Sequence, residues 1–189
     1  MSLQSKQELR KALRSAFPGV AQRNAESQSI CRHLCQWPVL QHASVVAAYI
    51  PLPREADITP VLAQVLEAGH TLALPRCGKA PNMIFHAVSS LAELVPGAYG
   101  IPEPKADAPA VAPEEFSLVL VPLEGVDGAG HRLGKGCGYY DNLLTKTNCL
   151  SVGIALSWQE CDSVPVEEQD RPLDAVADAE GIRIFRDIL

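Results

Sequence analysis

The chain has 189 residues, of which 47% are hydrophobic and 20% are charged, and its formal net charge is −6 at pH 7. This length and composition predict a single globular domain over residues 1–189, with no apolar run of about 20 residues that would cross a membrane. The acidic balance argues against a nucleic-acid-binding protein. Because the polar, basic N-terminus lacks the apolar core of a signal peptide, we expect a cytoplasmic location.

The expected secondary structure alternates between helices and strands. Apolar residues at helical spacing and stop signals such as Pro18-Gly19 predict helices over residues 3–17, 25–35, 59–68 and 139–144, with Thr59 as an N-cap. Apolar runs predict strands over residues 44–50, 71–74, 83–88, 116–121, 152–155 and 182–185, and residues 127–130 predict a turn. This alternation is typical of a three-layer α/β/α fold with a mainly parallel sheet.

The most informative stretch runs from Arg132 to Asp141 and reads RLGKGCGYYD, with glycines at alternate positions. Glycine lets backbone N–H groups approach a phosphate closely, and successive N–H groups form an anion-binding nest. Arg132 and Lys135 add positive charge, and Asp141 adds an oxygen ligand of the kind that Mg²⁺ prefers. The stretch therefore predicts a nucleotide site. It is neither a Walker A motif, which needs Ser or Thr after Lys135, nor a dinucleotide fingerprint.

Two further features have a structural and a functional interpretation. Lys6, Arg10 and Arg14 recur every four residues, a pattern that alone is more typical of a solvated helix face than of a phosphate contact. Glu55 follows an expected strand, where it is either a surface residue or a ligand contact at the carboxyl end of a parallel sheet. The residues alone leave both alternatives open.

The glycine-rich stretch resembles the signature of the 5-formyltetrahydrofolate cyclo-ligase (methenyltetrahydrofolate synthetase) family, roughly R-L-G-x-G-x-G-Y-Y-D. Other segments follow in the family's order and extend the resemblance over nearly the whole chain: residues 6–10, 49–51, 55–57, 74–76, 99–104, 119–122 and 166–170. The resemblance implies an enzyme that uses ATP and Mg²⁺ to convert 5-formyltetrahydrofolate to 5,10-methenyltetrahydrofolate, ADP and phosphate.

The resemblance also implies roles for individual residues. The implied ATP contacts are Lys6, Arg10, Arg132, Leu133, Gly134, Lys135, Gly136, Cys137, Gly138, Tyr139 and Tyr140. The implied folate contacts are Ile50, Glu55, Tyr99, Lys135, Tyr139 and Tyr140. Asp141 and Asp170 are the implied Mg²⁺ ligands, and Asp174 is a candidate for an outer contact to the metal.

Some positions depart from the family pattern. Val126 stands where the family often has Phe, and Cys137 occupies a variable position. Two alternatives therefore stay open: a non-catalytic paralogue that binds nucleotide or folate, and a related ATP-dependent enzyme with a thiamine-related substrate. In each case the expected partners are small molecules, with no nucleic acid and no membrane, and the expected state is a monomer or a weak homo-oligomer.

Overall fold

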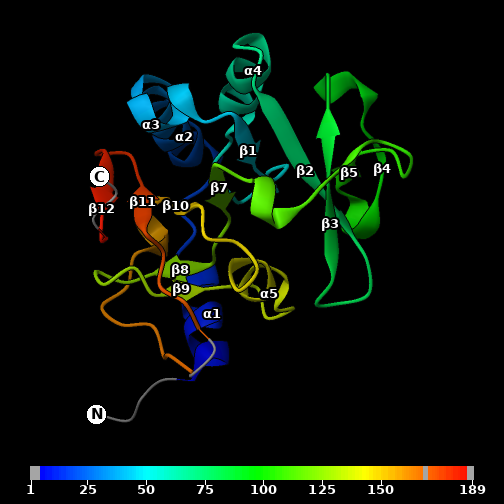
Figure 1. The fold of residues 1–189 in the computed structure, drawn as a ribbon. Helices are drawn as coiled ribbons and strands as arrows, with labels where there is room; N and C mark the ends of the chain where they lie inside the picture. The colour runs from blue at the N-terminus through cyan, green and yellow to red at the C-terminus, as the bar shows by residue number, and fades with distance from the viewer. Residues whose placement is uncertain (1–4, 168–169, 187–189) are drawn as a thin grey trace.

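A computed structural model describes residues 5–167 and 170–186, and one large sheet forms its centre (Figure 1). The strand order is β12-β11-β10-β7-β1-β2-β3-β6. Neighbours from β11 to β2 are parallel, whereas β12, β3 and β6 pair antiparallel. The strand bounds are β1 Val45–Ala47, β2 Thr71–Cys77, β3 Met83–Val88, β6 Ala110–Val111, β7 Leu118–Val121, β10 Leu150–Ile154, β11 Ala175–Ala177 and β12 Ile182–Ile184. The predicted mainly parallel α/β fold is confirmed.

Helices cover the two faces of the sheet unequally (Figure 1). Helices α2 (Val20–Gln36), α3 (Pro38–His42) and α4 (Thr59–Glu67) pack on one face, where they bury a continuous apolar core. The other face packs against the short helix α5 (Tyr139–Leu144), through Leu143 and Leu144. All four residues of β7 are buried, as expected for a central strand with both faces covered.

The first helix lies outside these layers. Helix α1 (Lys6–Ser15) begins with a capping box, in which Ser5 and Glu8 satisfy each other's backbone N–H groups. Its apolar side chains pack on Leu133 of the two-stranded sheet formed by β8 (Gly125–Val126) and β9 (Arg132–Leu133). The expected turn between these strands is present, and it closes with a hydrogen bond from Gly130 N to Asp127 O. The charged face of α1 is thereby fixed beside the glycine-rich stretch.

Several predicted boundaries were wrong. The second helix begins at Val20, five residues early, and α3 was not predicted. Thr59 is the first residue of α4 and Ile58 is its N-cap. Strand β2 passes through Pro75 to Cys77. The proline is tolerated because β1 pairs with β2 only as far as Ala73, so Pro75 has β3 on one side alone.

The remaining elements lie at the margins of the large sheet. Strands β4 (Val95–Pro96) and β5 (Pro102–Glu103) form a second small sheet, and the segment between them carries Tyr99. The short strands β4, β5, β6, β8, β9 and β11 were not predicted, because two or three residues carry too little periodicity to be recognised. Within the described residues, no helix is long and apolar enough to span a membrane.

Candidate active site

A pocket of about 300 Å³ lies where several parallel strands end. Tyr49 and Ile50 follow β1, Cys77 ends β2, and Pro122 follows β7. In open α/β sheets this carboxyl edge is the usual place for a ligand. The other walls come from residues 99–103 and from the glycine-rich stretch, so segments far apart in the sequence meet here. All four tyrosines of the chain line this pocket: Tyr49, Tyr99, Tyr139 and Tyr140.

The glycine loop, residues 134–138, joins β9 to α5 and forms one wall of the pocket. Gly136 and Gly138 have φ values of 97° and 72°, in the left-handed region that favours glycine. At Gly134 an added Cβ would lie 2.8 Å from a nitrogen of the Arg132 guanidinium. The three glycines thus allow a tight loop that a larger residue would disrupt.

Leu133 differs from its neighbours in the predicted ATP set. Its side chain is fully buried against Leu9 and Leu13 of α1, and it does not line the pocket. The direction follows from β9, in which Arg132 faces the pocket and the next side chain faces away. The side chain of Leu133 therefore anchors α1 beneath the glycine loop and is not placed to touch a ligand.

The cations of α1 contact this region to different extents. The Nε atom of Arg10 donates to Gly134 O at 2.7 Å, and Lys6 Nζ lies 2.6 Å from an oxygen of Asp170. Arg14 instead pairs with Glu124 at 2.9 Å, outside the lining of this pocket. Lys6 and Arg10 are therefore held at the loop and its acids, unlike an ordinary solvated helix face.

Arg132 connects the two predicted metal ligands. Its side chain is 4% exposed and pairs with Asp141, and its Nε atom has no hydrogen-bond partner among the described residues. Partial burial alone would raise the pKa of Asp170. The hydrogen bonds that its carboxylate accepts from Lys6 and from Glu167 N–H lower this pKa, as do the positive charges of Lys6 and Arg132. These lowering effects are larger, so the pKa of Asp170 lies below its usual value. Both carboxylates are thus within the electrostatic reach of one buried guanidinium.

Glu55 is a buried charged group that lines the pocket. It is 7% exposed, and its Oε1 atom lies 2.5 Å from Lys135 Nζ. Its Oε2 atom accepts a hydrogen bond from Leu52 N–H at 2.8 Å, and Arg23 Nε donates to the Glu55 carbonyl at 2.7 Å. The carboxyl group is therefore held through both of its oxygens, because a buried charged group needs partners of this kind.

Two tyrosines meet at the mouth of the pocket. Tyr99 is 71% exposed, with a φ of 57°, and its hydroxyl lies 3.4 Å from that of Tyr139. The Tyr139 hydroxyl donates to Gly78 O at 2.9 Å, so Tyr99 is the donor in the contact between the two phenols. The neighbouring Tyr99 hydroxyl and burial together raise the pKa of Tyr139 to about 12. Tyr140 is turned inward, where burial and the charge of Glu55 raise its pKa.

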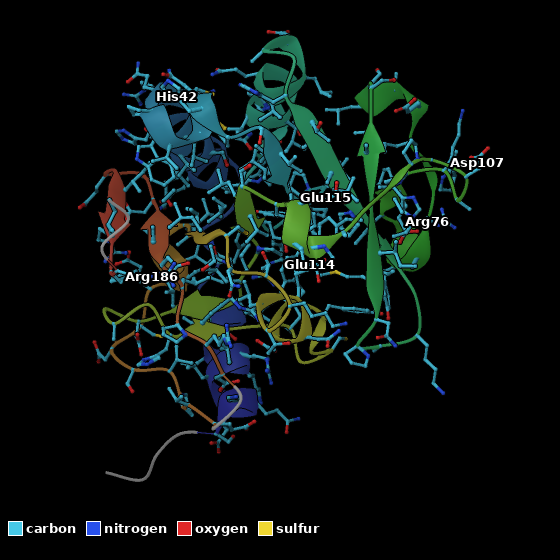
Figure 2. All side chains as sticks on the ribbon, in the orientation of Figure 1. His42, Arg76, Asp107, Glu114, Glu115 and Arg186 are labelled. Carbon is cyan, nitrogen blue, oxygen red and sulfur yellow. The ribbon has the colours of Figure 1, made fainter. Side chains whose placement is uncertain are left out.

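The structure also shows pocket residues to which no role was assigned. Tyr49 lines the floor, and Glu103, which is 4% exposed, accepts a hydrogen bond from Cys77 N–H at 3.1 Å. Tyr49 and Glu103 both lie in segments that resemble the family, and nothing else in the sequence indicated that they line a pocket. Asp174, by contrast, does not line this pocket: it accepts hydrogen bonds from Ser151 and pairs with Arg186. Figure 2 shows Arg186 on the opposite side of the molecule from Arg76, which lies beside the pocket residue Glu103.

Of the predicted contacts, the structure brings twelve to the lining of one pocket: Ile50, Glu55, Tyr99, Arg132, Gly134, Lys135, Gly136, Cys137, Gly138, Tyr139, Tyr140 and Asp141. Lys6, Arg10 and Asp170 do not line the pocket: Arg10 is hydrogen-bonded to the loop at Gly134, and Lys6 pairs with Asp170, which also feels the charge of Arg132. The fold and the site define an α/β protein with a small-molecule pocket at the carboxyl ends of its strands, bordered by a cationic glycine loop.

Comparisons with known proteins identify the family. The sequence model of the 5-formyltetrahydrofolate cyclo-ligase family matches residues 2–178. The 5-formyltetrahydrofolate cyclo-ligase of Escherichia coli (strain K12) is 32% identical in an alignment of 161 residues that covers 82% of this chain and 88% of that protein. The NMR structure of Aquifex aeolicus 5,10-methenyltetrahydrofolate synthetase has a TM-score of 0.85 and 34% identity, covering 96% of this chain and 93% of that one.

A second solved structure supports the fold alone. The 5,10-methenyltetrahydrofolate synthetase from Mycoplasma pneumoniae matches with a TM-score of 0.75 and 20% identity, covering 93% of this chain and 99% of that chain. Since the family match spans most of the sequence, the chain belongs to the 5-formyltetrahydrofolate cyclo-ligase family, and it is an enzyme.

Proposed function

We propose that this enzyme converts 5-formyltetrahydrofolate and ATP to 5,10-methenyltetrahydrofolate, ADP and phosphate. The observation that carries the proposal is a single pocket in which an anion-binding loop and a buried carboxylate meet, joined by the 2.5 Å contact between Lys135 and Glu55. A reaction between a phosphate donor and a pterin needs the phosphate-binding loop and the pterin-binding carboxylate in the same pocket. The names of the relatives support the same substrate and product.

The chemistry explains why ATP is required. The formyl oxygen on N5 is a poor leaving group. Its attack on the γ-phosphorus of ATP forms an O–P bond and releases ADP. The nitrogen N10 then adds to the activated formyl carbon and loses its proton to the departing phosphate or to water, and the C–O bond breaks with loss of phosphate. Such a sequence asks the protein mainly to position two ligands and to stabilise phosphate charge.

The phosphates would lie against the glycine loop. Its backbone N–H groups would bind the anion, and Arg132 and Lys135 line the same wall. Lys6 and Arg10 would add charge from α1, on the far side of Gly134. This arrangement concentrates cations locally in a chain whose formal net charge is −6.

Asp141 and Asp170 have the donor chemistry that Mg²⁺ requires, namely oxygen ligands next to a phosphate site. Each now pairs with a cation that we assign to the phosphates, Arg132 for Asp141 and Lys6 for Asp170. Phosphates that engage those cations would free both carboxylates for the metal. Bound Mg²⁺ would neutralise charge on the transferred phosphoryl group. Within the described residues no cluster of three acidic, His or Cys ligands forms, so phosphates and waters would complete the shell.

The folate would occupy the deeper half of the pocket. Glu55 would accept hydrogen bonds from the amino-pyrimidinone edge, and Ile50 would provide an apolar surface beside it. Tyr140 would separate the pterin from the phosphates, and the exposed ring of Tyr99 would close over the ligand.

The test is a stoichiometric assay on the purified protein. With 5-formyltetrahydrofolate, ATP and Mg²⁺, the absorbance of methenyltetrahydrofolate and the release of phosphate should rise together in a ratio of about one. Binding of both ligands without either product would overturn the proposal and support the non-catalytic alternative. A parallel reaction without folate measures any uncoupled ATP hydrolysis.

A further inference from the structure

Tyr49 places an unused hydrogen-bond donor on the floor of the pocket. The residue lies just beyond β1, is 4% exposed, and lines the pocket beside Ile50. Among the residues that the structure describes, none donates a hydrogen bond to its hydroxyl or accepts one from it. The hydroxyl is not fully enclosed by protein atoms, so it is a free hydrogen-bonding group that a ligand in the pocket can use.

The surroundings keep this phenol protonated. Burial raises the pKa of Tyr49 well above its usual value, and the negative charge of Glu55 raises it further. Tyr140 acts in the same direction, and the positive charge of Arg23 opposes these effects without reversing them. At neutral pH the hydroxyl is therefore a permanent donor close to the carboxylate that we assign to the pterin.

The chemistry of the pterin edge matches a donor beside a carboxylate. The amino-pyrimidinone edge presents two N–H donors followed by a carbonyl oxygen. Glu55, as a carboxylate, only accepts hydrogen bonds, so it satisfies the two donors and leaves the carbonyl unpaired. We propose that the Tyr49 hydroxyl donates to this carbonyl oxygen and thereby selects 4-oxo pterins. The inference rests on the folate substrate of the proposed function.

The other tyrosines are less suited to this role. Tyr139 already donates its hydroxyl proton to Gly78 O at the mouth of the pocket, and Tyr99 donates to Tyr139. Tyr140 lies toward the phosphate side, where its ring is 5.8 Å from the Arg132 guanidinium. The charge of Glu55 raises the pKa of both Tyr49 and Tyr140, and Tyr49 is the one of the two that lies just beyond β1, beside Ile50.

The experiment compares two ligands on two variants. Affinities are measured by calorimetry for 5-formyltetrahydrofolate and for its 2,4-diamino analogue, in which an amino donor replaces the carbonyl. Tyr49→Phe should weaken binding of the oxo compound about tenfold and weaken the diamino analogue less, because only the carbonyl oxygen takes the hydroxyl proton, so selectivity for the oxo compound falls. Tyr139→Phe, which removes a hydroxyl at the mouth, should leave that ratio unchanged. Melting temperature and affinity for a non-hydrolysable ATP analogue report on folding.

Each outcome decides the proposal. A fall in the ratio in Tyr49→Phe alone supports it. An unchanged ratio in Tyr49→Phe overturns the role of Tyr49 while the proposed function stands, as does an equal fall in Tyr139→Phe. Equal weakening of both ligands with a lower melting temperature shows a merely structural role. If the wild-type protein binds neither ligand, the proposed function fails together with this inference.

Discussion

The Nζ atom of Lys135 lies 2.5 Å from the Oε1 atom of Glu55, so the cation of the glycine loop and the buried carboxylate beyond β1 form one ion pair. We assign Glu55 to the pterin and Lys135, which the family resemblance implies as a contact of both ligands, chiefly to the phosphates. Each ligand therefore competes with one end of the same contact. This relationship links the two halves of the pocket and gives the first prediction.

We expect ATP to strengthen folate binding. A phosphate that draws Lys135 away releases Oε1 of Glu55 for the pterin, whereas without ATP the folate must break the ion pair itself. A saturating non-hydrolysable ATP analogue should therefore raise folate affinity about fivefold or more. Lys135→Met should abolish this coupling, and calorimetric titrations with and without the analogue measure it.

The matched control for this prediction is Arg14→Met. Arg14 is a cation of the same region, but it pairs with Glu124 and does not line the pocket. Its loss should leave the coupling intact. Equal coupling in wild type and Lys135→Met would show that the ion pair does not connect the two ligands.

Glu55→Gln should impair folate binding and leave ATP binding nearly intact. The amide accepts at one atom only and presents a donor at the other, so a charge-assisted bond is lost and a pterin N–H is left unpaired. The cost is about 2–4 kcal/mol, or roughly 30- to 1,000-fold in affinity. Glu124→Gln is the control, because Glu124 pairs with Arg14 outside this pocket. Unchanged folate affinity in Glu55→Gln would remove this residue from the site.

Asp141→Asn should abolish turnover and weaken the dependence on Mg²⁺ while the fold survives. The amide retains the shape of the carboxylate but not its charge, so a hard cation loses a preferred ligand. We expect kcat/KM to fall about 100-fold or more. Asp174→Asn, at the distant pair with Arg186, should keep the Mg²⁺ dependence of the wild type. Turnover at the wild-type level in Asp141→Asn would contradict the metal assignment.

The cations of α1 should act on ATP alone. Lys6→Met and Arg10→Met each remove a positive charge that is held against Asp170 or the glycine loop, so the KM for ATP should rise about tenfold and the KM for folate should change little. Steady-state kinetics with each substrate varied in turn gives both values. An unchanged KM for ATP in both variants would make these residues structural anchors only.

The class of fold could be predicted from the sequence, because an apolar run such as that of β7 indicates a buried strand without knowledge of its neighbours. The second helix was placed late, since residues 20–24 are mostly polar and lack an apolar stripe, and β8 and β9 are too short to carry a period. Their existence depends on packing against α1, which no local pattern reveals. Strand β2 was cut short because proline was treated as a stop signal.

The candidate site shows the same limit. The glycine loop and Glu55 were recognisable from residue type and from the family resemblance. The ion pair between Lys135 and Glu55 was not, because it joins segments separated by 80 residues and exists only in the folded chain. Leu133 was grouped with the ATP contacts because it stands between Arg132 and Gly134, but the alternation of β9 turns its side chain into the apolar contact with α1.

The central claim is that the formyl oxygen attacks the γ-phosphorus of ATP within this pocket. The most direct measurement uses 5-formyltetrahydrofolate labelled with ¹⁸O in its formyl group and follows the label by mass spectrometry. Our account predicts that the released phosphate carries one ¹⁸O atom for each methenyltetrahydrofolate formed. Unlabelled phosphate would show that ATP is hydrolysed by water without activating the formyl group, and would contradict the proposed reaction.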